Sequence, residues 1–259
     1  MTRLQDSSLR RGRSVAIRSD RLYLRVKTAL TDGLSEGRWA FGESIPSESA
    51  LSRLFDVSIG TVRHAIDELV TEGILVRQHG RGTFVASHTR DYLYNVFFRI
   101  VDPDGSRQRA APRLISFRRG YADAATALQL RIARGSAIYR IVNAIMLDGR
   151  TIACDDIRLP QRLFPALTRD EVAQRDGTVY GVLQSRYGVD ALWAKELISA
   201  VRAGAWAGSM LGLRTNSPVL RLQRTAYSYK DLPIDFRYRY ISTRRHCYLS
   251  MLGRASGID

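Results

Sequence analysis

Residues 45–85 decide the fold of the first part of the chain, and they read IPSESALSRLFDVSIGTVRHAIDELVTEGILVRQHGRGTFV. Ser47 and Ser58 each stand directly before a run with apolar residues at helical spacing, where a serine oxygen can accept from the free amides of the first turn. After Gly73 the period changes, and the β-prone runs 74–78 and 83–86 flank a glycine-bearing loop. The stretch therefore predicts two helices joined by a tight turn and followed by a β-hairpin.

An amphipathic helix precedes this stretch, because Leu22, Val26, Leu30 and Leu34 recur at intervals of four before Gly37. Three helices and a hairpin make the layout of a winged helix-turn-helix, whose second turn helix enters the major groove of DNA. The predicted contacts are the helix starts, the outward face of that helix and the loop of the wing. They are Ser47, Ser58, Gly60, Thr61, Arg63, His64, Gln78, His79, Gly80 and Arg81.

The chemistry of these positions suits nucleic acid. Hydroxyls and free backbone N–H groups at a helix start bind phosphates, and Arg63 can bind a phosphate or a guanine. Arg81 in the wing is attracted by the negative potential of the minor groove. Two plainer readings stay open at this stage: Arg63 paired with Asp67, and His79 as an ordinary exposed turn residue.

Composition sets outer limits. The chain has 259 residues, of which 45% are hydrophobic and 25% charged, as in a globular protein of about two domains. The net charge of +15 favours a polyanionic partner, but most of the excess lies beyond residue 88, so this support is weak. No apolar run is long enough to span a membrane. We expect a soluble, cytoplasmic protein.

The two cysteines indicate no disulfide framework, and both are expected to be inert core thiols. His246 beside Cys247 lacks the further ligands of a zinc site, so we expect neither metal nor cofactor.

The remainder of the chain alternates strands and helices without a regular βαβ period. This pattern predicts an α+β domain built on an antiparallel sheet, with a hairpin turn at Asp148-Gly149. Strands are expected at 95–101, 114–118, 137–147, 151–159, 192–201, 217–229, 233–241 and 246–251, and helices at 122–130, 178–186 and 203–212.

Residues 22–85 resemble the DNA-binding domain of GntR-type bacterial repressors. The resemblance rests on 45–48, 57–58, 61–63, 68–69, 72–75 and 80–85, which agree with the family pattern without a gap. Two usual arginine positions of the family hold Ser49 and Ile59 here, so the operator of a relative does not transfer to this chain.

Residues 95–252 resemble the UTRA ligand domain of the HutC subfamily, whose fold is that of chorismate lyase. The marks are 138–140 before Asp148-Gly149, then 155, 159–160, 177–180, 211–213, 218–222 and 233–235. The predicted organisation is a basic tail (1–20), a winged helix-turn-helix domain (21–87), a linker with a first strand (88–111), a UTRA-like effector-binding and dimerisation domain (112–252) and a C-terminal tail (253–259).

The resemblance also suggests effector residues. An arginine pair that relatives use for sugar phosphates is replaced by Asn143 and Ile145, which disfavours a phosphosugar. Asp155, Thr178 and Asp235 match effector-binding positions of relatives. From the residues themselves we add Arg140, Arg237 and Tyr240, whose arginines suit a carboxylate effector. Asp155 and Asp156 are adjacent on a strand and must face opposite ways, so they cannot form a catalytic pair.

The sequence thus predicts a homodimeric, ligand-responsive transcription regulator, a repressor that a small metabolite releases from a palindromic operator in double-stranded DNA. The alternative is an enzyme with lyase-type activity in the second domain, but no convergent acid–base set supports it.

Overall fold

A computed structural model describes residues 22–40, 42–86, 97–175 and 177–250. Contacts divide the chain into two compact units, residues 1–88 and 89–259. Each is described by itself. The predicted tails at 1–20 and 253–259, and most of the predicted linker, lie outside the described residues. No described helix has both the length and the apolar character that a membrane crossing requires.

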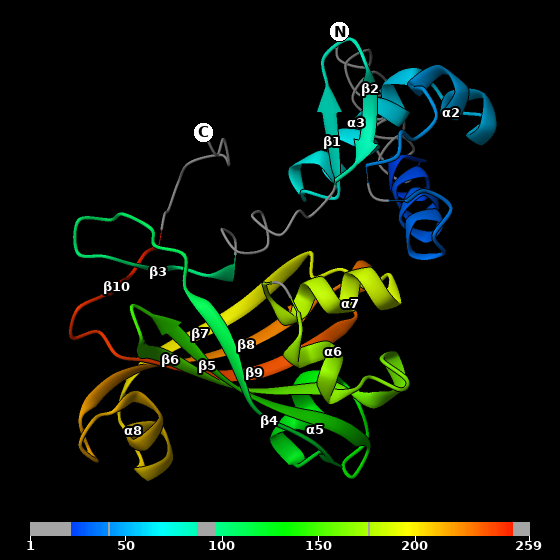
Figure 1. The fold of residues 1–259 in the computed structure, drawn as a ribbon. Helices are drawn as coiled ribbons and strands as arrows, with labels where there is room; N and C mark the ends of the chain where they lie inside the picture. The colour runs from blue at the N-terminus through cyan, green and yellow to red at the C-terminus, as the bar shows by residue number, and fades with distance from the viewer. Residues whose placement is uncertain (1–21, 41, 87–96, 176, 251–259) are drawn as a thin grey trace, which may run out of the picture. The chain divides into compact units, whose positions relative to one another are not determined.

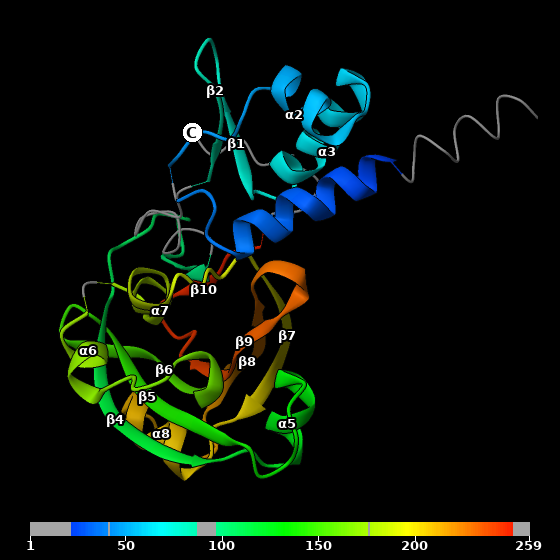
Figure 2. The ribbon, with the colours of Figure 1, turned by 90° about the vertical axis from the view of Figure 1, so that its right-hand side faces the viewer.

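The first unit is the predicted winged helix-turn-helix (Figures 1 and 2). A helix over 22–35 is followed by α2 (Glu48–Phe55), α3 (Ile59–Thr71) and a hairpin of β1 (Leu75–Gln78) and β2 (Gly82–Val85). α3 buries Val62, Ala65, Ile66 and Leu69 at helical spacing, and this stripe packs the three helices together. Gly73 follows α3 with φ +70°, a backbone conformation that glycine adopts without strain.

The second unit is built on a six-stranded antiparallel sheet of order β4-β5-β6-β9-β8-β7. Its strands are β4 (Ala111–Tyr121), β5 (Ala137–Leu147), β6 (Arg150–Pro160), β7 (Trp193–Arg202), β8 (Pro218–Tyr227) and β9 (Pro233–Ile241). Asp148 and Gly149 have φ values of 47° and 72° and form the tight turn between β5 and β6 that the sequence predicts. A two-stranded ribbon pairs β3 (Ile100–Val101) with β10 (Cys247–Tyr248).

Helices cover both faces of this sheet (Figures 1 and 2). On one face, the core joins α6 (Arg169–Ala173) and α7 (Val179–Tyr187) to Tyr139, Ile157 and Ile234 of the sheet. On the other face, α8 (Ala205–Leu211) packs against Cys154 and Val219. α5 (Ala124–Leu130) packs near Ile138 on that same face. Short 3-10 turns occur at Gln161–Leu163 and Tyr229–Asp231.

Several sequence expectations differ from this fold. β4 is longer than the predicted 114–118, and the predicted strand 95–101 is described only from Phe97 and is a strand only over Ile100–Val101. α6 was not predicted, although Thr168 and Glu171 form a capping box at its start. Cys154 is buried, but Cys247 is exposed, so the expectation of two core thiols is wrong for the second.

Candidate DNA-binding surface and effector cavity

The starts of α2 and α3 are capped by the two predicted serines. The Ser47 Oγ accepts from the amide of Ala50 at 3.2 Å, and the Ser58 Oγ accepts from that of Thr61 at 3.1 Å. The hydroxyls of Ser58 and Thr61 lie 2.9 Å apart. Both caps satisfy one first-turn amide and leave polar groups at the surface, where phosphates bind helix starts.

Arg63 points outward from α3 and is held by α2. Its Nε donates to Oε2 of Glu48 at 3.0 Å, and Glu48 Oε1 also accepts from Arg77 of β1 at 3.1 Å. The hydrogen bond and charge of Glu48 raise the pKa of Arg63. Asp67 instead pairs with Arg77 at 2.6 Å, so the alternative pairing of Arg63 with Asp67 is not the one formed. Arg63 remains 58% exposed, so this ion pair can exchange for a phosphate.

An open hollow lies between the starts of α2 and α3 and the wing. It is lined by 44–49, Ile59, Arg63 and 77–83, and so brings together Ser47, Arg63, Gln78, His79, Gly80 and Arg81 of the predicted contacts. Gly80 and Gly82 have φ values of 70° and 117°, which keep the wing loop compact and free of side chains on either side of Arg81. The hollow thus combines helix starts, an outward arginine and a glycine-bearing loop, which are features that contact the DNA backbone in nucleic-acid-binding proteins.

The remaining predicted contacts lie outside that lining. Ser58, Gly60 and Thr61 form the exposed or half-exposed start of α3. His64 points elsewhere: its ring stacks on Tyr23 of the first helix with centroids 4.1 Å apart. His64 is exposed and is turned about 100° from Arg63 around the helix, so a DNA contact by His64 stays a prediction.

The second unit contains a cavity of about 260 Å³ on the α7 side of its sheet. Its walls come from the sheet, from the start of α7 and from the residues before β3. The polar lining residues are Arg109, Asn143, Asp155, Arg175, Thr178, Tyr180, Arg224, Arg237 and Arg239, and the others are Phe97, Phe98, 110–112, Ile145, Gly177 and Val179. This volume suits a small metabolite.

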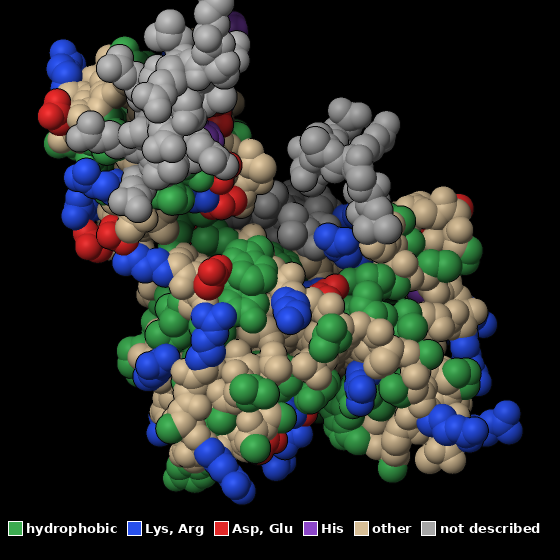
Figure 3. Space-filling view, turned by 180° about the vertical axis from the view of Figure 1, so that it is seen from behind, with side chains coloured by type: hydrophobic (Ala, Val, Ile, Leu, Met, Phe, Trp, Pro, Cys, Tyr) green, Lys and Arg blue, Asp and Glu red, His purple; other side chains and the backbone are tan. Residues whose placement is uncertain are grey.

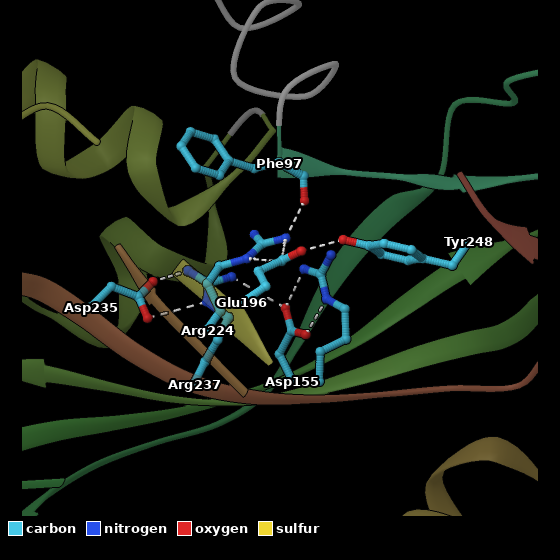
Figure 4. Close-up of polar contacts among 8 residues, drawn as sticks. Phe97, Asp155, Glu196, Arg224, Asp235, Arg237 and Tyr248 are labelled. Atoms are coloured by element: carbon cyan, nitrogen blue, oxygen red, sulfur yellow. Dashed lines mark hydrogen bonds and ion pairs between the residues drawn. The ribbon is translucent and has the colours of Figure 1, made fainter. Parts of the chain in front are cut away.

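A buried ion-pair network forms the floor of the cavity (Figure 4). Arg239 binds Asp155 through two parallel bonds, Nε to Oδ1 at 2.6 Å and Nη2 to Oδ2 at 2.8 Å. Arg237 contacts Asp155 at 3.4 Å and also pairs with Asp235. Burial alone raises the pKa of Asp155, but the charges and hydrogen bonds of Arg239 and Arg237 outweigh burial and lower it. Asp155 is therefore an anion that two arginines already hold.

Positive charge exceeds negative charge along this wall. Arg175 donates from Nη1 to the carbonyl of Val172, while its Nε and Nη2 are buried without a partner among the described residues. Burial lowers the pKa of Arg175 to about 10. Nη1 of Arg224 and Oδ1 of Asn143 are likewise buried and unpaired in the described part of the chain. Arg175 therefore places positive charge without an acidic partner among the described residues on the cavity wall.

Thr178 stands at the start of α7, as predicted, but its side chain makes no capping hydrogen bond. Its hydroxyl and the neighbouring Gly177 line the cavity. Val179 and Tyr180 in the first turn of α7 also line the cavity, so the positive end of the helix dipole lies at its wall.

The structure separates the six predicted effector residues. Asp155, Thr178 and Arg237 line the cavity, and Asp235 lies behind it as the partner of Arg237. Arg140 and Tyr240 do not belong to this group, and their assignment is corrected.

Strand alternation explains both errors. Arg140 lies on the opposite face of the sheet, where it pairs with Asp156 at 2.8 Å. Tyr240 follows Arg239 on β9 and therefore points away from it, toward the ring of Trp206 in α8.

Arg175, Arg224 and Arg239 were not predicted. Arg239 carried a signal, because it stands two residues from Arg237 on one strand and must share its face. Arg224 could not be assigned to the cavity from the sequence, because only the register of β8 against β9 places it opposite Arg237.

No group of three or more His, Cys, Asp or Glu side chains capable of holding a metal ion occurs in the described part of the chain. Figure 3 shows that Lys and Arg side chains on that face of the larger unit are scattered rather than gathered.

Comparison with known proteins bears on both units. Residues 22–85 match the model of bacterial regulatory proteins of the gntR family, and residues 106–246 match the model of the UTRA domain. The chain is 25% identical over 213 residues to the "Probable fructoselysine utilization operon transcriptional repressor" of Escherichia coli, covering 82% of this chain and 87% of that protein.

Two further similar proteins are also transcriptional regulators. Identity to the histidine utilization repressor of Pseudomonas putida is 25% over 209 residues, covering 80% of this chain and 82% of that protein. The crystal structure of the ligand-binding domain of a GntR-family regulator from Bordetella bronchiseptica superposes with a TM-score of 0.57 at 26% identity, covering 60% of this chain and 96% of that one. The family and these relatives are regulators rather than enzymes, which removes the lyase alternative.

Fold, motifs and relatives agree: the chain belongs to the GntR family of bacterial regulatory proteins, in the group whose second domain is a UTRA domain.

Proposed function

We propose that this regulator is a one-component repressor whose winged unit binds an operator and whose cavity binds a small anionic metabolite that releases it. The observation that carries the proposal is the buried, positively charged cavity on the same chain as the open Arg63–wing hollow. The relatives named as repressors of utilization genes support the same role.

On DNA, two copies of the chain would each present α3 to one half of a palindrome, with half-sites about one helical turn apart. Arg63 and Arg81 would contact phosphates or base edges, and the wing glycines would allow the backbone to approach a groove. The protein would act on the nucleoid of the bacterial cell. Light scattering on the full chain should give the mass of a dimer.

In the cavity we propose a carboxylate as the ligand. Arg175 has no acidic partner among the described residues, and the start of α7 adjoins it, so one carboxylate group satisfies both. A phosphate ester is the less favoured ligand, since Asn143 and Ile145 replace the arginine pair of the relatives that sense phosphosugars.

Fluorescence anisotropy tests the DNA half of the proposal. The full chain is titrated onto DNA from upstream of its own gene and onto scrambled DNA of equal length, with salt stepped from about 50 to about 200 mM. We expect binding to the upstream DNA about a thousandfold tighter at the higher salt. Equal affinity for both would place the operator elsewhere, and no binding to either would overturn the proposal.

Thermal shift tests the ligand half. Benzoate, succinate and inorganic phosphate are added separately to wild type and to Arg175→Gln. A carboxylate at about 100 times its Kd should stabilise wild type by about 2.7 kcal/mol. The shift should be lost in Arg175→Gln and kept in Arg140→Gln, since Arg140 lies on the opposite face of the sheet. Stabilisation by phosphate alone would contradict the carboxylate assignment.

A further inference from the structure

Four residues from distant parts of the second unit meet at one edge of the cavity (Figure 4). Arg224 of β8 donates from Nε to Glu196 of β7 at 2.5 Å and from Nη2 to the carbonyl oxygen of Phe97 at 2.7 Å. The hydroxyl of Tyr248 in β10 donates to the other oxygen of Glu196. We call Phe97, Glu196, Arg224 and Tyr248 the Arg224 network.

The network is buried and therefore firmly held. Arg224 is 2% exposed, so its charge depends on Glu196 for compensation. Burial raises the pKa of Glu196, but the charge of Arg224 and the hydrogen bond from Tyr248 outweigh burial and keep it low. Loss of one member leaves the others with unpaired polar groups, so the contacts of the network stabilise one another.

Phe97 is the first described residue of the second unit, and in the sequence it follows Ala86, the last described residue of the DNA-binding unit. Shortly beyond it, β3 pairs with β10, in which Tyr248 stands opposite Ile100. Ile100 and Phe98 pack on Ile145, Leu222 and neighbouring sheet residues. The Arg224 network thus fixes residues 97–101, the first described residues of the second unit, by both a backbone carbonyl and the β3–β10 ribbon. We call residues 97–101 the entering segment.

The same network forms part of the cavity wall. Arg224 and Phe97 both line the cavity, and the guanidinium carbon of Arg224 lies 5.4 Å from the ring centroid of Phe97. Nη1 of Arg224 is buried and unpaired among the described residues. Because a guanidinium is a rigid plane, any turn of the group that brings Nη1 to an anion also moves Nη2, which holds the Phe97 carbonyl.

We propose that Arg224 is a positioning residue, which holds the entering segment in its DNA-binding arrangement and gives up that hold when an anion binds its free Nη1. The inference rests on the proposed function and deepens it by naming the residue that couples the two sites. A charge-assisted bond to an anion is stronger than the bond to a neutral carbonyl, so ligand binding favours the released arrangement. This difference between the two states is what coupling requires.

The test uses the full chain without ligand and compares Arg224→Gln with Arg221→Gln. Arg221 is the matched control, since it lies three residues away on β8 and faces the other side of the sheet. Arg224→Gln should weaken operator binding about fivefold or more, the lower range of allosteric coupling, while Arg221→Gln leaves it unchanged. Hydrogen–deuterium exchange of residues 98–101 should become faster in Arg224→Gln alone.

Tyr248→Phe is a second variant that keeps the test decisive if Arg224→Gln does not fold. It removes the hydroxyl at the far end of the network and leaves the cavity lining intact, and it should produce a smaller shift of the same sign in both measurements.

The outcomes separate the two proposals. If wild type binds the operator specifically but Arg224→Gln and Arg221→Gln have equal affinity, the coupling role is overturned and the proposed function stands. If residues 98–101 exchange at the wild-type rate in Arg224→Gln, Arg224 does not hold the segment, and the inference is wrong whatever the DNA result. If wild type binds neither the operator nor scrambled DNA, the proposed function fails, and the coupling role fails with it.

Discussion

The two units of this regulator use arginine in opposite ways. On the winged unit, Arg63 and Arg77 share Glu48 at the surface, where water screens their charges and each bond is easily exchanged. In the second unit, Arg237 and Arg239 share Asp155 in the protein interior, where neither partner can be lost without leaving a bare charge. An arginine–carboxylate ion pair is therefore an exchangeable surface contact in the winged unit and a structural element in the second unit.

Removal of the shared carboxylate in each unit tests this contrast directly. Asp155→Asn should lower the free energy of unfolding by about 3–5 kcal/mol, because Arg239 stays buried without its partner. Glu48→Gln should stay within about 1 kcal/mol of wild type. Urea denaturation, followed by the fluorescence of Trp193 and Trp206 for the second unit and of Trp39 for the first, measures both. Equal losses would contradict the contrast.

A buried carboxyl without an arginine should respond to pH instead. Asp190 is 1% exposed, and burial raises its pKa to about 7. Between the unfolded pKa of about 4 and this value, only the folded state holds the proton, so stability falls as pH rises, by at most about 1.4 kcal/mol per unit. Asp190→Asn should remove this fall and be more stable than wild type above pH 7. Parallel pH profiles of the two melting temperatures would rule the effect out.

The surface arginine matters for DNA rather than for folding. Arg63→Ala should weaken operator binding about tenfold while the melting temperature and ligand response stay as in wild type. Arg53→Ala is the control, because Arg53 is an exposed arginine in the last turn of α2 and outside the hollow. Unchanged operator affinity in Arg63→Ala would show that α3 is placed wrongly on the groove.

The smallest effect on operator affinity is expected from a change of Glu48, the ion-pair partner of Arg63. Glu48→Gln frees Arg63 and Arg77 and removes a negative charge from the hollow, so operator affinity should rise a few-fold. The slope of log affinity against log salt should steepen by up to about one. Anisotropy at three salt concentrations measures both, and weaker binding would mean that Glu48 orients Arg63 for DNA rather than restraining it.

Local signals made the first unit predictable. Its caps at Ser47 and Ser58, the glycine after α3 and the hairpin each depend on neighbours in the sequence. The sheet of the second unit followed from its strand pattern and the Asp148-Gly149 turn. The cavity residues were harder to predict. Side chains alternate between the two faces along a strand, which separated Asp155 from Asp156, and this alternation had to be applied to every strand. Applied to β9, it places Tyr240 opposite to Arg237.

Other residues of the cavity carried no local signal. Arg224 is inward because β8 pairs with β9 in one register, and its contact with Phe97 joins residues 127 positions apart. The ribbon of β3 and β10 likewise joins two ends of the domain. Such contacts arise from the closed fold and cannot be read from spacing.

The shared Asp155 has a consequence for how such regulators diversify. Arg237 and Arg239 hold the sheet together as well as lining the cavity, so their replacement costs the fold before it changes the ligand. Arg175, Thr178 and Asn143 line the cavity without an ion pair to another side chain in the described part of the chain. New ligand preferences should therefore arise at these three positions, and a mutational library aimed at a redesigned biosensor should start with them.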